Sequence, residues 1–351
     1  MPNRLSRLLP GIPDRFVATL VLASAFVVFL TVDQMHWWQL KPDYAFGWLV
    51  PAFVVYLVFD RWAKLQQIFR ATGASPLPRA LHRLVTATAG LTLAAGLVFF
   101  LLGAVYRAGA GATQPGSLAL AMGFSGVLLG MIYFNVPDGR IGTDGSVAGW
   151  RALWVDARLR AVALFVFPAL IWILSAPLVT AVENAISLLL LRKVVTVVFT
   201  LFSLLGYPLV QEGNVLVLPR GSVGVADACS GIRSLTGCLF AGSFLAAVFL
   251  DRFWKKILLV GLAMGFAFLT NLLRSVFLTA WAYAYGSDAI EGRLHDITGF
   301  AVLGLTCLGL LCLLPLFKAA NWYRWLGVTP PLQFSIVPAG GAGASVGDPA
   351  G

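Results

Sequence analysis

The chain has 351 residues, of which 59% are hydrophobic and 11% are charged, and apolar stretches of membrane-spanning length recur along it. This composition excludes a soluble globular protein and predicts an all-α polytopic membrane protein. The formal net charge of +10 does not indicate a nucleic-acid partner, because the Lys and Arg residues lie in short segments between apolar runs. Such placement predicts membrane topology instead.

Eight apolar stretches are predicted to span the membrane as helices. They are Phe16–Val32, Phe46–Phe59, Leu84–Val105, Leu118–Val136, Ala161–Val182, Ser230–Leu250, Ile257–Tyr285 and Ile297–Phe317. The second is short and contains Pro51, so we expect it to be tilted, to be kinked or to begin earlier, at Tyr44. A further apolar stretch, Ile186–Leu205, is interrupted by Arg192 and Lys193, which favours a helix lying in the membrane interface over a ninth span.

Basic residues gather in alternate connecting segments. These segments precede the first predicted span or follow the second, fourth, sixth and eighth, so they lie on one side of an eight-span bundle. The positive-inside rule assigns that side to the cytoplasm. Residues 1–15 and the segment after the last span are therefore predicted to be cytoplasmic. Five spans precede Cys229, which places this cysteine on the outer side.

Two short runs rich in β-branched residues flank Pro219-Arg220-Gly221-Ser222, ahead of the sixth predicted span. This pattern predicts a small β-hairpin over residues 213–226, which must lie outside the hydrocarbon because its edges are open. Residues 326–351 are rich in Gly, Ala and Pro and are predicted to form a disordered cytoplasmic tail. Residues 16–325 would then form one transmembrane domain.

Cys229 lies where the predicted hairpin meets an apolar helix. Unpaired backbone N–H groups and the helix dipole at such a junction favour thiolate over thiol. Arg233, about one helical turn later, can place its charge on the same face. The alternative is that Cys229 is a small packing residue, as most membrane-embedded cysteines are. Cys238, Cys307 and Cys312 lie inside apolar runs and are predicted to be packing residues, without metal-ligand spacing.

Two further polar anomalies fall on the same predicted side. Arg274 follows Ile257 by about 26 Å of helix, near the outer edge of a hydrocarbon core about 30 Å thick. Asn271, three residues earlier, shares its face. His295 stands at the start of the last predicted span, after an outer loop. Each has a structural alternative, a snorkelling arginine and a surface or capping histidine.

Together, Cys229, Arg274 and His295 supply what acyl transfer from a peptide bond requires. They offer a thiolate nucleophile, a cation for the oxyanion and an imidazole that exchanges protons. One alternative is a membrane cysteine protease that only hydrolyses; another is a non-enzymatic transporter or assembly protein in which Arg274 lines a solute path. No phosphate-binding glycine loop or metal-ligand spacing is present, so no cofactor and no metal are predicted.

The order of these motifs closely resembles that of the exosortase/archaeosortase family. The resemblance covers Tyr44 to about Phe317 and is most specific over residues 206–299, where Glu212-Gly213-Asn214 precedes Cys229-Ser230-Gly231, Asn271-Leu272-Leu273-Arg274 and His295. It implies a membrane-embedded cysteine transpeptidase with Cys229 as nucleophile, Arg274 as catalytic arginine and His295 as acid/base. Arg233, Asn271, Ser230 and Glu212 are expected to support the site or to bind substrate.

The resemblance also implies the partners and the location. The substrates would be exported proteins with a C-terminal sorting signal of the PEP-CTERM type: a Pro-Glu-Pro motif, a transmembrane helix and a basic cluster. Membrane lipids would be the other partners, and the site would face the periplasm from a bacterial inner membrane. One departure stands out, because many members have a His-Gly pair in the second-span motif, where this chain has Phe46-Gly47.

Overall fold

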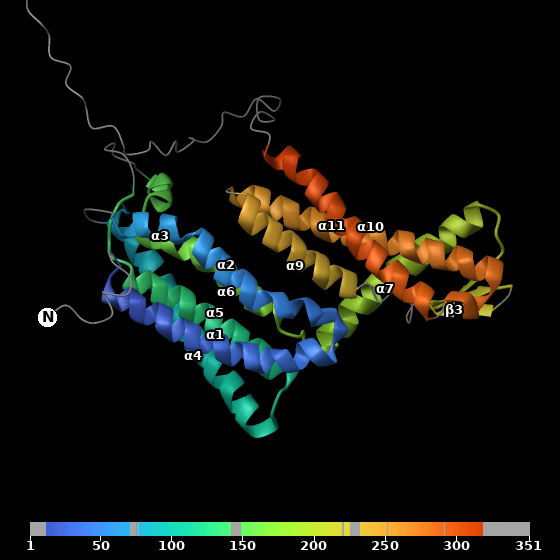
Figure 1. Ribbon diagram of the computed structural model, residues 1–351, viewed down its shortest axis with the longest axis horizontal. Helices are drawn as coiled ribbons and strands as arrows, with labels where there is room; N and C mark the ends of the chain where they lie inside the picture. Colours follow the sequence, from blue (N-terminus) through green and yellow to red (C-terminus); the bar gives the residue numbers. More distant parts are fainter. Residues whose placement is uncertain are drawn as a thin grey trace, which may run out of the picture.

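The computed structural model describes residues 12–70, 75, 77–141, 149–219, 221–224, 232–250, 252–290 and 292–318 (Figure 1). The elements are α1 (Asp14–Leu40), η2 (Pro42–Leu49), α2 (Val50–Asp60), α3 (Trp62–Phe69), α4 (Arg79–Ala110), α5 (Gln114–Asn135), η3 (Gly149–Trp154), α6 (Ala157–Ser175), α7 (Thr180–Leu204), β1 (Val210–Glu212), β2 (Val215–Leu218), β3 (Gly221–Gly224), α9 (Ile232–Phe249), α10 (Phe253–Tyr285), η4 (Ser287–Ile290) and α11 (Arg293–Lys318).

Within the described part of the chain, eight helical stretches are long and apolar enough to cross a membrane. This confirms the all-α polytopic architecture. Seven predicted spans coincide with such stretches; the eighth stretch is α7, and the remaining predicted span is α9, whose apolar part Ser234–Phe249 is shorter. In Figure 1, α7 runs across the direction of α9 and α11 instead of along it.

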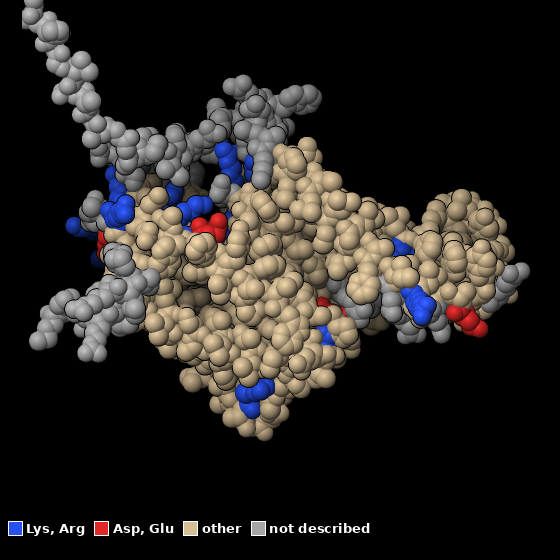
Figure 2. Space-filling view, viewed as in Figure 1, with Lys and Arg blue, Asp and Glu red and all other residues tan. Residues whose placement is uncertain are grey.

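The charges are unevenly distributed over this bundle. On the face drawn in Figure 2, most Lys and Arg residues gather at the end of the molecule where α3 lies. A broad uncharged surface separates them from the few charges at the other end. We call that other end, where α1 and α6 finish and α9 and α11 begin, the site end.

The second predicted span begins early, as expected. It starts as the 3₁₀ helix η2 at Pro42 and continues as α2 from Val50, with Pro51 in the first turn of α2. Proline is tolerated there because the first N–H groups of a helix have no intrahelical partner.

The predicted fifth span, Ala161–Val182, is wrong at its C-terminal end. α6 stops at Ser175, and Ala176 is extended with φ −75° and ψ 142°. The reason is Pro177, which disfavours helical conformation in the residue before it. The freed backbone groups are paired with side chains of other elements: Trp38 Nε1 donates to the Ser175 carbonyl at 3.1 Å, and the Leu178 N–H donates to Tyr44 Oη at 3.0 Å.

The region before Cys229 is a three-stranded antiparallel sheet in the order β1-β2-β3. The predicted hairpin corresponds to β2 and β3, while β1 is a third strand that the prediction missed. β1 and β2 pair through Glu212 and Val215, which leaves Gly213 and Asn214 as a two-residue turn. Gly213 has φ +63°, which suits the first central position of a type II′ turn.

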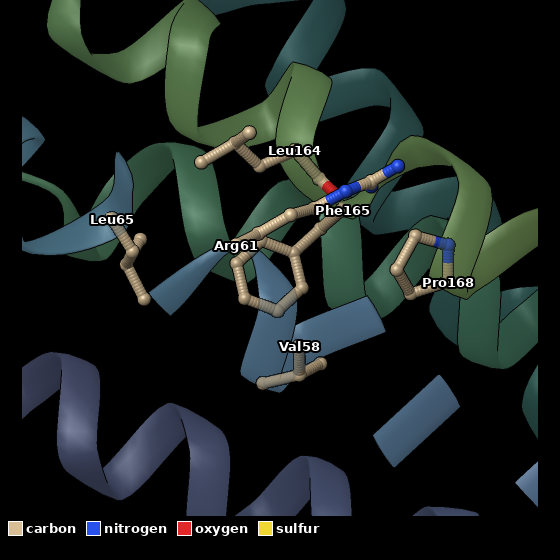
Figure 3. Close-up of a pocket in the computed structure, with 6 residues that line it drawn as sticks. All are labelled: Val58, Arg61, Leu65, Leu164, Phe165 and Pro168. Atoms are coloured by element: carbon tan, nitrogen blue, oxygen red, sulfur yellow. The ribbon is translucent and has the colours of Figure 1, made fainter. Parts of the chain in front are cut away.

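Arg61, between α2 and α3, is a buried structural cation. Its Nη1 donates to the Leu164 carbonyl (Figure 3). Its Nη2 donates to the Ala247 carbonyl at 3.2 Å. Pro168 lies four residues after Leu164 inside α6 and has no N–H, so Leu164 has no helical donor. Ala247 lies in the last turn of α9, where carbonyls have no partner within the helix. Arg61 therefore joins the α2–α3 junction to α6 and α9 by donating to a backbone carbonyl of each.

Replacing Arg61 with methionine should destabilise the protein by about 2–4 kcal/mol, because two buried carbonyls lose a charged donor. Thermal unfolding in detergent measures this effect. Arg70→Met removes an exposed arginine nearby and serves as the matched control, with an expected change within about 0.5 kcal/mol. Equal unfolding temperatures for the two variants would contradict the structural role of Arg61.

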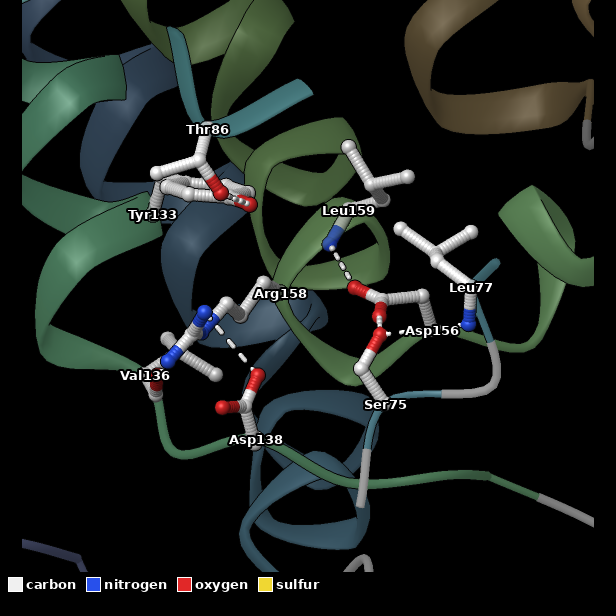
Figure 4. A network of polar contacts seen from close by, with 9 residues as sticks. All are labelled: Ser75, Leu77, Thr86, Tyr133, Val136, Asp138, Asp156, Arg158 and Leu159. Atoms are coloured by element: carbon white, nitrogen blue, oxygen red, sulfur yellow. Dashed lines mark hydrogen bonds and ion pairs between the residues drawn. The ribbon is translucent and has the colours of Figure 1, made fainter. Parts of the chain in front are cut away.

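At the end opposite the site end, α6 begins in a polar network (Figure 4). Asp156 caps α6 by accepting the Leu159 N–H at 3.1 Å, and its second oxygen accepts the Ser75 hydroxyl at 2.6 Å. Arg158 forms an ion pair of 2.9 Å with Asp138, which follows α5. These contacts fix the start of α6 against the segments that follow α3 and α5.

Candidate functional site

The start of α9, directly after the segment that contains Cys229, packs against η2. The Thr236 hydroxyl donates to the Asp43 carbonyl at 2.9 Å and to the Ile232 carbonyl at 2.9 Å. Phe240, one turn further on, is buried and stacks on Phe46 with ring centroids 4.8 Å apart. The first turns of α9 are therefore held by the second-span motif.

This packing accounts for Phe46-Gly47 in that motif. Phe46 is an aromatic packing residue on Phe240, in the position where many members of the resembled family have histidine. Gly47 cannot carry a side chain, because a Cβ atom there would lie 2.1 Å from Trp38 Nε1. Trp38 in turn donates its N–H to the end of α6, so the motif connects α1, α6 and α9 at the site end.

Arg274 lies on α10, at the level where α11 begins. α10 has 33 residues, and its length of about 50 Å exceeds the hydrocarbon thickness of about 30 Å. Arg274 Nε donates to Thr298 Oγ1 at 3.2 Å. A Cβ atom on Gly299 would lie 3.7 Å from Arg274 Nη2. The guanidinium therefore rests against Thr298 and Gly299 of α11.

His295 precedes these two residues by three and four positions, so its backbone lies on the same face of α11. The sequence reasoning missed Thr298 as the partner of Arg274. The spacing of three from His295 is the signal that points to it, since residues three apart share a helix face.

Asn271, one turn before Arg274, is buried. The residue is 3% exposed, and its Oδ1 has no hydrogen-bond partner among the described residues, which do not include 225–231 or the side chain of His295. Nearby, the Ser275 hydroxyl donates to the Asn271 carbonyl at 2.9 Å. The Thr270 and Thr306 hydroxyls pair at 2.9 Å between α10 and α11. Polar side chains thus lie between α10 and α11 next to Arg274.

The other predicted site residues are placed only in part. Cys229 and Ser230 lie outside the described residues. Arg233 is in the first turn of α9 and His295 in the first turn of α11, but their side chains are not among those described. Glu212 ends β1 and is exposed. In the structure, Arg274 contacts Thr298, one helical turn after His295. The contacts of the Cys229 and His295 side chains remain predictions.

No group of three or more His, Cys, Asp or Glu side chains in the described residues is arranged to hold a metal ion.

One of three comparisons with known proteins found a match. The family model described as "Transmembrane exosortase (Exosortase_EpsH)" matches residues 37–313, more than half of the chain. No curated protein and no solved structure matches significantly. The matched range begins before η2 and ends within α11, so it includes every predicted site residue. The chain therefore belongs to the transmembrane exosortase family, which makes it a multi-pass membrane protein and supports a general role as a sorting transpeptidase that acts on proteins with sorting signals.

Proposed function

We propose that this protein is a membrane-embedded cysteine transpeptidase that cleaves a PEP-CTERM-like C-terminal sorting signal from exported proteins. Cleavage occurs at the outer face of a bacterial inner membrane, with both termini of the enzyme in the cytoplasm. Family membership supports the reaction class. The observation that carries the site assignment is the bond from Arg274 Nε to Thr298, one helical turn after His295.

In the proposed reaction, the sorting helix of the substrate docks beside the bundle and brings the preceding peptide bond to the site end. The Cys229 thiolate attacks the carbonyl carbon, and the Arg274 guanidinium stabilises the oxyanion. His295 gives its proton to the departing amine as the C–N bond breaks. The thioester then passes its acyl group to an amine or hydroxyl acceptor. His295 takes the proton of the acceptor as the C–S bond breaks and the Cys229 thiolate is released.

Thr298 has a defined part in this scheme. Its hydroxyl accepts the Arg274 Nε–H, and this bond fixes the orientation of the planar guanidinium. Thr298 is thus a positioning residue, because it acts through Arg274.

The residues around the proposed catalytic set take supporting roles. Asn271 Oδ1 is a buried acceptor suited to a backbone N–H of the substrate. Arg233 favours the thiolate of Cys229 or binds an acidic residue of the sorting motif. Ser230 follows the nucleophile directly. Glu212 is exposed on β1 and is available to the part of the substrate outside the membrane.

Thr298→Val should lower the rate of substrate processing about tenfold, because Arg274 loses a charge-assisted hydrogen bond that orients it. Thr298→Ser keeps the hydroxyl and should restore most of the rate. The measurement is the initial rate of reporter cleavage in membranes, at several reporter levels, so that turnover and apparent affinity separate. Combining Thr298→Val with Arg274→Met should add no further loss, and additive losses would rule out action through Arg274.

A membrane-impermeant maleimide applied to spheroplasts tests the proposed orientation and reactivity. Wild-type protein should be labelled at Cys229 within minutes, while Cys229→Ala should stay unlabelled under the same conditions. A non-enzymatic bundle that uses Cys229 only for packing would not react preferentially at this position. Labelling of Cys229 only after permeabilisation would contradict the outward orientation.

A further inference from the structure

Helix α7 has no part in the proposed reaction, yet it carries two adjacent cations midway along an apolar sequence. Its buried face packs against α10 and β2, and consists of Leu191, Val194, Val195, Val198 and Phe202. Arg192 and Lys193 lie on its exposed side. Neither cation forms an ion pair with a residue in the described part of the chain.

The exposed side of α7 is apolar on both sides of the cations. Leu188 and Leu189 precede them and are exposed, as are Val197 and Leu201 after them. A helix that combines a cationic centre with an exposed apolar surface is typical of helices that lie at a membrane surface.

The way α7 is anchored supports this orientation. Its first turn is attached to the site end of the bundle by an ion pair of 2.5 Å between Glu183 and Lys41, which follows α1. Thr180 Oγ1 also donates to Gln114, the first residue of α5, at 2.5 Å. From there α7 runs across the direction of α9 and α11 (Figure 1). A helix along the membrane normal would instead place Arg192 about 18 Å from its start, near the middle of the hydrocarbon.

The neighbouring part of α10 has the side chains expected at a membrane interface. Phe277, Trp281 and Tyr285 follow one another on successive turns and are exposed, with ring centroids 5.7 and 4.7 Å apart. Aromatic residues of this kind concentrate at the level of the lipid headgroups. α7 and the end of α10 pack together, so both would meet the headgroup region at the site end.

We infer that α7 lies in the interface of the leaflet at the site end and that Arg192 and Lys193 bind the phosphate groups of anionic phospholipids. This inference is independent of the proposed reaction. The apolar residues beside the two cations would enter the upper part of the acyl chains. Because β2 packs on α7, the lipid contact would also hold the sheet that precedes Cys229 against the membrane.

Photocrosslinking in nanodiscs tests this inference on the full-length protein. The discs consist of phosphatidylcholine with a trace of a phospholipid that carries a diazirine near the glycerol end of one acyl chain. This probe lipid has either a phosphatidylglycerol or a phosphatidylcholine headgroup. Peptide mass spectrometry then quantifies crosslinks to residues 180–204. Wild-type protein should give more crosslinks there with phosphatidylglycerol, by a factor on the order of ten.

In the double variant R192Q/K193Q, the two probe lipids should give equal amounts of crosslinking to α7. R79Q/R83Q is the matched control, because it removes two exposed arginines from α4 at the opposite end; the enrichment at α7 should persist in it. Unchanged crosslinking along α5 shows that each variant is folded. Equal crosslinking by both lipids in the wild type, as a lipid-facing spanning helix would give, overturns the inference. So does the absence of crosslinks at α7.

Discussion

Cys229→Ala should abolish removal of the sorting helix from a reporter protein. Loss of the nucleophile removes the covalent route altogether, and comparable deletions in covalent proteases cost several orders of magnitude in rate. The measurement is a pulse–chase of a reporter that carries a candidate C-terminal sorting signal, co-expressed with wild type or variant. The expected result is full-length reporter throughout the chase with Cys229→Ala.

Cys238→Ala, nine residues further along the chain, is the matched control. Cys238 is fully buried in α9, with 0% exposure, and its sulfur is a packing group. We expect this variant to process the reporter at nearly the wild-type rate, with at most a modest loss of stability from the small cavity. Processing at the same rate by both cysteine variants would exclude Cys229 as the nucleophile.

The second large effect on the processing rate is expected from replacing Arg274. Arg274→Met should lower the rate of processing about 10²- to 10³-fold, because the oxyanion loses its charged donor. Arg274→Lys keeps the charge, but it cannot both bond Thr298 and present a planar pair of donors, so we expect an intermediate rate. Initial rates of reporter cleavage in isolated membranes measure both variants.

Arg293→Met supplies the control for Arg274, since Arg293 is exposed at the start of α11. It should process the reporter normally. Protein level and thermal unfolding of each variant in detergent separate catalytic from structural loss. Normal processing by a stable Arg274→Met protein would remove Arg274 from the mechanism and leave it as a snorkelling residue.

The sequence predicted most of the helical architecture because apolar length is a strong signal in membrane proteins. Seven predicted spans coincide with long apolar helices, and α9 begins within two residues of the predicted Ser230. The main error, the end of the fifth span, came from reading hydropathy across Pro177. Apolar side chains continue through that position, but the backbone preference of the residue before proline ends the helix.

The candidate site could be predicted as a set of residue types but not as contacts. The spacing of Asn271 and Arg274 on one helix face follows from periodicity alone. The bond to Thr298 depends on how α10 and α11 pack, which sequence spacing within one helix does not determine. The role of Arg61 could not be predicted for the same reason. Arg61 donates hydrogen bonds to carbonyls on two other helices, and one of these carbonyls lacks its helical donor because of Pro168, more than 100 residues away.

The β1 strand was missed in the sequence analysis for a different reason. Val210-Gln211-Glu212 is a short run beside a two-residue Gly213-Asn214 turn, which is itself a hairpin signal. The prediction assigned Gly213 to the start of the hairpin and so missed the pairing on its other side. Three residues carry too little periodicity to identify a strand without its partner.

The intact mass of the reporter recovered from cells tests the central claim most directly. With wild-type enzyme, we expect a reporter that ends at the sorting motif, has lost its transmembrane helix and basic cluster, and carries the added mass of an acceptor. With Cys229→Ala, we expect the full-length mass. Truncation without added mass would show a hydrolytic cysteine protease. A full-length reporter in both strains, with a sorting signal from the same genome, would contradict the assignment of Cys229, Arg274 and His295 as a transpeptidase site.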